Sequence, residues 1–209
     1  ITVNYGEGGG AETLDYRRDN RTMQLDHVFQ KAGTYTVTVS VRDDSLPTSR
    51  LGTDSFQVTV LNTPPEVAFN EVLLTKRIRE GETVNLSGTF EDLGQRDNHT
   101  IEVNWGDGTP IVPQAIAVGA RAFTLSHRYD DDGVSRTDSY VYRVVVTVRD
   151  QLGAASQTPV FLVEVDNILP SSLQTSLSSS VVNEGQTVTL NGSFIDPGVQ
   201  DTDLVYIDW

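Results

Sequence analysis

Hydrophobic and polar residues alternate along this chain with a period of two. In residues 34–41 every second residue is tyrosine or valine, and threonine or serine stands between them. Residues 83–91 repeat the pattern, although Gly88 interrupts it and predicts a bulge or a close approach of two backbones. Strict alternation is typical of half-buried antiparallel strands, and no segment shows the 3.6-residue period of an amphipathic helix. The pattern therefore predicts an all-β chain with no helical domain.

Segments of the sequence also recur at a spacing of about a hundred residues. Residues 80–92, which begin Glu-Gly-Glu-Thr-Val, return 104 residues later as residues 184–196, which begin Glu-Gly-Gln-Thr-Val. Residues 3–8 match residues 103–108 in the same way. A period of this length, filled with short strands, predicts tandem immunoglobulin-like β-sandwiches.

The phase of the repeat divides the chain into three units. We expect residues 1–63 to be the C-terminal part of a first unit, residues 64–167 a complete second unit, and residues 168–209 the N-terminal part of a third. Asparagine followed within three residues by proline marks the two linkers. Each partial unit would expose a core face, so we expect intermolecular completion between 1–63 and 168–209, as a swapped dimer or a head-to-tail fibre.

Composition removes several classes of function. The chain has no Cys, three His and a formal net charge of −14. It therefore cannot build a disulfide framework, a thiolate nucleophile, a Cys-ligated zinc site or an iron–sulfur cluster, and its acidity disfavours nucleic acid and anionic lipid. No apolar run approaches the roughly 18 to 20 residues of a membrane-spanning helix, so this segment is not expected to insert into a membrane.

An ordered set of motifs recurs from unit to unit. The second unit has Trp-Gly-Asp-Gly at 105–108, His-Arg-Tyr at 127–129, and a valine-alternating strand from Tyr142 to Asp150. This order resembles the signature of polycystic-kidney-disease (PKD) repeats, and the resemblance covers essentially the whole chain. The matching residues are Tyr5, His27, Tyr35 and Asp43 in the first unit, and Trp105, Gly106, Asp107, Gly108, His127, Tyr129, Tyr142 and Asp150 in the second.

The resemblance implies a non-enzymatic array in an extracellular or cell-surface protein, secreted by a bacterium. Its partners would be the neighbouring repeats of the parent chain. Three functions follow from it: a passive spacer or stalk, an adhesion module that contacts protein or carbohydrate, and an accessory domain of a secreted hydrolase.

The motif residues have a structural interpretation. Trp105 is expected to anchor the sandwich core, and Gly106 and Gly108 to supply positive φ in a tight turn. Asp107 is expected to bind amides of that turn. His27 and His127 occupy the same phase of the repeat, as a recurring packing or hydrogen-bonding position would. We therefore assign no catalytic residue.

Recurring carboxylates are the candidates for a metal site. We expect them to lie at one end of each unit, where oxygen ligands from a loop would suit calcium and make the array a calcium-stiffened adhesin segment. The alternative is that turns favour acidic residues and that solvated acids keep the chain soluble. Asp130, Asp131 and Asp132 are interpreted as a solvated turn because they lack the spacing of an EF-hand loop. The candidate ligands are Glu80, Asp92, Asp97, Glu184, Asp196, Asp201 and Asp203.

Overall fold

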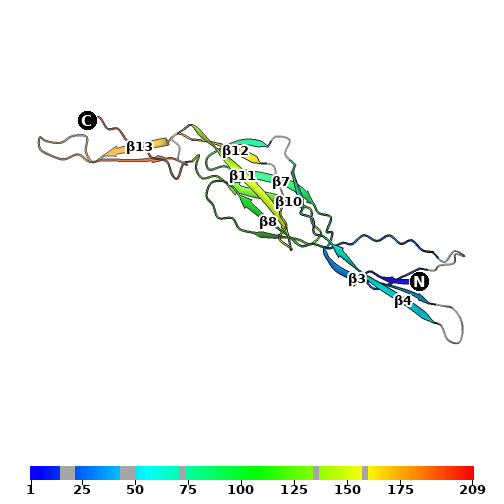
Figure 1. The fold of residues 1–209 in the computed structure, drawn as a ribbon. Helices are drawn as coiled ribbons and strands as arrows, with labels where there is room; N and C mark the ends of the chain where they lie inside the picture. The colour runs from blue at the N-terminus through cyan, green and yellow to red at the C-terminus, as the bar shows by residue number, and fades with distance from the viewer. Residues whose placement is uncertain (15–21, 43–49, 71–73, 134–136, 157–159) are drawn as a thin grey trace.

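The computed structural model describes residues 1–14, 22–42, 50–70, 74–133, 137–156 and 160–209, which form β-strands and no helix. The units follow one another along an elongated molecule, from the blue strands of the first, through the green middle unit, to the orange hairpin of the third (Figure 1). The all-β class predicted from the alternation is confirmed. Within the described part of the chain, there is no helix able to span a membrane.

The strands of these residues are β1 (Thr2–Asn4), β2 (Glu12–Thr13), β3 (Gly33–Arg42), β4 (Leu51–Val60), β5 (Glu66–Phe69), β6 (Thr75–Arg79), β7 (Thr83–Glu91), β8 (His99–Asn104), β9 (Gln114–Ile116), β10 (Ala122–Arg128), β11 (Ser139–Asp150), β12 (Phe161–Asp166), β13 (Ser171–Leu177) and β14 (Leu190–Ile195).

The first unit is one antiparallel sheet with the strand order β2-β1-β3-β4. β3 holds the alternating stretch that the sequence analysis singled out, and it pairs with β4 from Gly33↔Val60 to Arg42↔Leu51. Val37 on β3 is buried, whereas Phe56 on β4 is 53% exposed. Asp43, the last residue of the predicted strand, lies outside the described residues. In the third unit, β13 and β14 form an antiparallel hairpin.

The middle unit is a sandwich of two sheets. One sheet has the order β10-β7-β5 and the other the order β6-β12-β11-β8-β9. The chain changes sheets between β5 and β6: β5 pairs antiparallel with β7, and β6 pairs parallel with β12. The apolar residues of the alternating strands lie on the inward faces of both sheets. They form a packed layer between the sheets, as in immunoglobulin-like sandwiches.

Alternate residues of facing strands form the core of the middle unit. Val84, Leu86 and Phe90 of β7 are 0–1% exposed, and they face Val144 and Val146 of β11, which are fully buried. Burial of each such side chain contributes about 1.5–3 kcal/mol to the free energy of folding. Their β-branched and aromatic character suits a pleated surface, so local preference and packing favour the same structure.

Gly88 breaks the alternation of β7 because two neighbours approach it closely. A Cβ at this position would lie 2.6 Å from the carbonyl oxygen of Ala68 on β5 and would collide with the ring of Phe123 on β10. The close approach predicted from the sequence is therefore the reason for the glycine.

Replacing Gly88 with alanine should overpack the sandwich and lower the free energy of unfolding by roughly 1–3 kcal/mol. Urea unfolding followed by tryptophan fluorescence measures this, because Trp105 packs against the core and Trp209 is 79% exposed. Gly52→Ala is the matched control, since a Cβ there meets only the carbonyl oxygen of Val41, at 3.9 Å. Equal effects of the two changes would contradict the explanation.

Candidate functional site at the unit junctions

The Trp-Gly-Asp-Gly motif forms a tight turn after β8. Gly106 and Gly108 have φ values of 85° and 84°, a left-handed conformation that glycine adopts without strain. Asp107 Oδ1 accepts hydrogen bonds from the backbone nitrogen and the hydroxyl of Thr109, at 3.1 Å and 2.7 Å. His127 on β10 donates from Nε2 to the other oxygen, Oδ2, at 2.6 Å. The acid and the histidine of the motif are therefore engaged with each other and with the turn.

The aromatic residues of the motif form a continuous stack of rings. Trp105 stacks on His127 with 4.7 Å between ring centroids, Tyr129 meets His127 edge-on at 4.8 Å, and Tyr129 stacks on Tyr142 at 4.8 Å. Trp105 is half-buried and packs against the core from its edge, whereas Tyr129 is 1% exposed and is the central ring. The first unit holds the same stack, made of Tyr5, His27, Phe29 and Tyr35.

The last tyrosine of each stack donates a hydrogen bond to a backbone carbonyl near the neighbouring unit. The hydroxyl of Tyr142 donates to the backbone carbonyl of Asp131 at 3.1 Å, and that of Tyr35 donates to the carbonyl of Lys31 at 2.7 Å. Burial, helped by the charge of Asp131, raises the pKa of Tyr142 to about 12, so the hydroxyl keeps its proton near neutral pH. These bonds make Lys31 and Asp131 structurally equivalent residues of the first and middle units.

The predicted metal ligands of the middle unit do not lie together. Glu80 precedes β7 and Asp92 follows it, so a nine-residue strand separates them, about 30 Å at the rise of a β-strand. The expectation that these acids share one end of the unit is therefore wrong for Glu80 and Asp92. Glu80 faces the third unit, and Asp92 and Asp97 face the first.

The first junction is the contact between the first and middle units. The backbone nitrogen of Arg96 donates to the carbonyl of Gln30 at 3.2 Å, and Asn62 Nδ2 donates to Asp150 Oδ2 at 2.6 Å. Asp97 Oδ1 accepts from Gln151 at 2.8 Å. Burial raises the pKa of Asp97, an effect that the nearby charge of Lys31 opposes.

Asp92 is hydrogen-bonded within the middle unit. Its Oδ2 contacts Nε2 of the buried His99 at 2.7 Å, and its Oδ1 accepts from the backbone nitrogen of Gly94 at 2.7 Å. Both carboxylate oxygens therefore have protein partners at the first junction.

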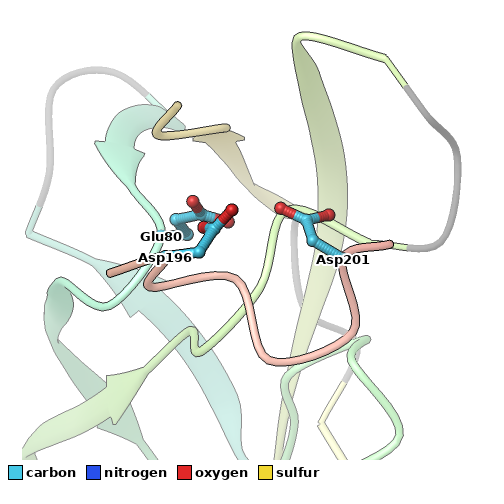
Figure 2. Close-up of side chains that lie close together, drawn as sticks. All are labelled: Glu80, Asp196 and Asp201. Atoms are coloured by element: carbon cyan, nitrogen blue, oxygen red, sulfur yellow. The ribbon is translucent and has the colours of Figure 1, made fainter. Parts of the chain in front are cut away.

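The second junction is the contact between the middle and third units, and it gathers acids from both. One oxygen of each of Glu80, Asp196 and Asp201 lies within 4.8 Å of the others, and Asp131, Asp132 and Asp201 form a second such group. Figure 2 shows Glu80 reaching from the turn after β6 toward Asp196 and Asp201, which stand on one loop of the third unit. Glu184 and Asp203 are exposed and belong to neither group.

Asp131 and Asp132 are functional candidates that the sequence analysis did not include. They are 5% and 3% exposed, so the interpretation of residues 130–132 as a solvated turn is wrong for both. The third unit covers them: Gln200 donates its backbone nitrogen to Asp131 Oδ2 at 2.6 Å. The signal that could have identified them is their place two and three residues after the motif tyrosine, Tyr129, where the first unit has Lys31 and Ala32.

The carboxylates of the second junction raise the pKa values of one another. Burial raises the pKa of Glu80, and the charges of Asp201, Asp132 and Asp196 raise it further. Asp201 and Asp132 shift upward for the same reasons, burial first and neighbouring carboxylates second. Among the described residues, Glu80 Oε2, Asp132 Oδ2 and Asn167 Oδ1 are buried without a hydrogen-bond partner. Negative charge therefore exceeds its local compensation at this junction.

Fold and junctions together define a class of protein, an all-β chain in which an immunoglobulin-like sandwich is joined end to end with further β units. The family model of the PKD domain matches residues 62–165, which span the sandwich from β5 nearly to the end of β12. The middle unit is therefore a PKD domain, as its motifs indicated.

No curated protein matches the chain. Among solved structures, the fibronectin(III)-like modules of Clostridium thermocellum CbhA share 14% identity, with a TM-score of 0.35 over 65% of this chain and 62% of that one. The FN1–FN3 domains of chicken CNTN1 share 9%, with a TM-score of 0.28 over 94% and 76%. The chain thus spans less than two thirds of the CbhA modules.

Replacing Asp107 with asparagine should lower the free energy of unfolding at pH 7 by roughly 1–3 kcal/mol, the usual loss for a hydrogen-bonded charge. Although burial opposes the shift, hydrogen bonds from Thr109 and His127 lower the pKa of Asp107 below its ordinary 3.8. The unfolded chain therefore binds the proton more readily, and the stabilisation is complete above pH 3.8 and lost as the pH falls below it.

Urea midpoints of the native chain and of Asp107→Asn, measured from pH 7 down to pH 3, should therefore converge in acid. Glu66→Gln removes an exposed acid of β5 and should leave the midpoint at pH 7 unchanged. A difference between the native chain and Asp107→Asn that stays constant down to pH 3 would contradict the role given to the carboxylate.

Proposed function

We propose that this chain is a non-enzymatic spacer segment of an extracellular or cell-surface protein, in which PKD units are stacked with a fixed geometry. The observation that carries the proposal is a backbone hydrogen bond that recurs at both junctions. Arg96 nitrogen donates to the carbonyl of Gln30 at the first junction, and Val199 nitrogen donates to the carbonyl of Asp130 at the second, at 3.2 Å and 3.4 Å.

The recurrence matters because the two acceptors are equivalent residues and the two donors lie on equivalent loops of successive units. Both donors belong to the loop that follows a Phe-x-Asp segment, with Val199 one repeat position before the equivalent of Arg96. Each acceptor directly follows the last ring of the His-x-aromatic motif. A backbone contact does not depend on which side chains a unit carries, so further units of the same kind can dock in the same way. Reach would then grow in proportion to the number of repeats.

The linker at the first junction supports a stiff connection. Asn62 is held by Asp150 of the middle unit, and the next residues include Pro64 and Pro65, of which Pro65 is buried. Each proline fixes φ and shortens the list of conformations open to the linker. A linker so restricted transmits orientation from one unit to the next.

The motif side chains support a structural and not a catalytic role. Both oxygens of Asp107 and Nε2 of His127 are used within the turn, and His127 lies between two rings, stacked on Trp105 and edge-on to Tyr129. The acid and histidine of the first unit, Glu7 and His27, form the same contact at 2.9 Å. A pair that recurs with the fold unit stabilises the unit.

Distances between spin labels test the proposal, and the absence of cysteine from the chain makes labelling selective. Labels at Gln57→Cys and Thr124→Cys, on exposed positions of β4 and β10, span the first junction. A narrow distribution of distances is expected. Removal of the linker contact by Asn62→Ala should broaden it.

Asn70→Ala is the control, because Asn70 bonds Ser87 inside the middle unit and should leave the distribution narrow. A native distribution as broad as that of a flexible tether would overturn the spacer proposal, since freely jointed units cannot hold a fixed separation.

A further inference from the structure

The two junctions share a backbone framework and differ in charge. Each uses a tyrosine hydroxyl to hold the carbonyl of the residue at the contact, and that residue is Lys31 at the first junction and Asp131 at the second. The next position changes from Ala32 to Asp132, and His99 of the middle unit corresponds to Asp203 of the third. The acids that both junctions share, Asp97 and Asp201, therefore have a cationic neighbour only in the first.

The second junction contains buried oxygen atoms that lack a partner. Glu80 is 1% exposed; its Oε1 accepts from the backbone nitrogen of Ile168 at 2.7 Å, and its Oε2 has no hydrogen bond. Asp132 is 3% exposed and its Oδ2 is likewise unpaired. A buried carboxylate oxygen without a donor is costly, and the cost rises when the nearest groups are other carboxylates.

The unpaired Oε2 of Glu80 lies beside the carboxylate of Asp201, because a Cβ placed on Gly198 would meet both groups. Glu80 forms one group of closely spaced ligand atoms with Asp196 and Asp201, and Asp132 forms the other with Asp131 and the same Asp201. Figure 2 shows the carboxylates of the first group turned toward one another. A cavity of about 560 Å³, lined by Asp132, Asp196 and Asp201 among others, borders the cluster.

We propose that the second junction binds a divalent cation of the calcium class, held by Glu80, Asp196 and Asp201 with Asp132 beside them, and that Lys31 takes the place of this cation at the first junction. Carboxylate oxygens from several segments suit calcium, which accepts six to eight oxygen ligands in a flexible arrangement. Magnesium demands a small, regular octahedron and keeps most of its water. The adjoining cavity has room for the water molecules that would complete a calcium shell.

The cation would join two units, because Glu80 and Asp132 belong to the middle unit and Asp196 and Asp201 to the third. Its mechanical consequence rests on the proposed spacer function. With the cation bound, the second junction is stiff; without it, repulsion among the carboxylates loosens the contact. The first junction is stiff in either condition.

Calcium binding is measured by isothermal titration of the metal-free full chain with calcium chloride alone. Saturable binding is expected, and Glu80→Gln and Asp201→Asn should each weaken it by roughly 10- to 100-fold or more. The matched control is Asp97→Asn, the equivalent of Asp201 at the first junction, which should bind calcium as the native chain does. Circular dichroism confirms that each variant is folded.

A further variant, Asp131→Lys, copies the first junction into the second. It should reduce calcium affinity to the same degree, while the bond from Tyr142 to the backbone of residue 131 persists. No saturable binding by the native chain, or equal losses in Asp97→Asn and Asp201→Asn, would overturn the proposal.

Spin labels separate this proposal from the spacer proposal. Labels at Thr124→Cys and Ser176→Cys, both exposed, span the second junction. Their distances should narrow with calcium and broaden with EDTA, whereas the Gln57→Cys and Thr124→Cys pair should not respond. Narrow distance distributions at both junctions without calcium binding would support the spacer proposal and refute the cation site. Calcium binding with broad distributions at both junctions would support the cation site and refute the spacer proposal.

Discussion

One hydrogen bond, from the hydroxyl of Tyr142 to the backbone carbonyl of Asp131, connects the interior of the middle unit to its surface contact with the next unit. The tyrosine is fixed by its stack on Tyr129, so the core determines where this carbonyl lies. The adjoining residues then receive the third unit through Val199 and Gln200. A sandwich with disordered packing would present no defined docking loop. This dependence explains why the ring stack recurs with the repeat.

The two junctions share a backbone framework but compensate the charge of their buried carboxylates differently. Desolvating several carboxylates requires a compensating positive charge, a proton or a change of structure. The first junction has a lysine at the critical position, and its Asp92 is paired with His99. The second junction has aspartate at both corresponding places. Side-chain identity at two positions thus distinguishes junctions whose geometry is otherwise shared.

The sequence predicted those parts of the structure that follow from local patterns. Alternation identified the strands because one face of each is buried, and Gly88 was correctly interpreted because only a missing side chain permits the approach of Phe123. The repeat of about a hundred residues placed the sandwich, because each unit must contain enough strands to close two sheets. Asp107 and His127 followed from their fixed spacing within the motif.

The sequence did not predict the contacts that depend on neighbouring units. Glu80 and Asp92 look like one set when read along the chain, but the length of β7 sends them to different junctions. The burial of Asp131 and Asp132 requires the third unit to cover them, which composition and local pattern do not report. Docking between units is a long-range property, so it had to come from the three-dimensional arrangement.

The passage of the chain from β5 in one sheet to β6 in the other affects how the middle unit would respond to tension. The linkers lead to the start of β5 and away from the end of β12, and β6 and β12 are parallel neighbours with five register pairs, from Thr75↔Leu162 to Arg79↔Asp166. A pulling force would draw these two strands in opposite directions along their length. Their hydrogen bonds would then be loaded together in shear and not opened one at a time, which is the more resistant geometry for a load-bearing module.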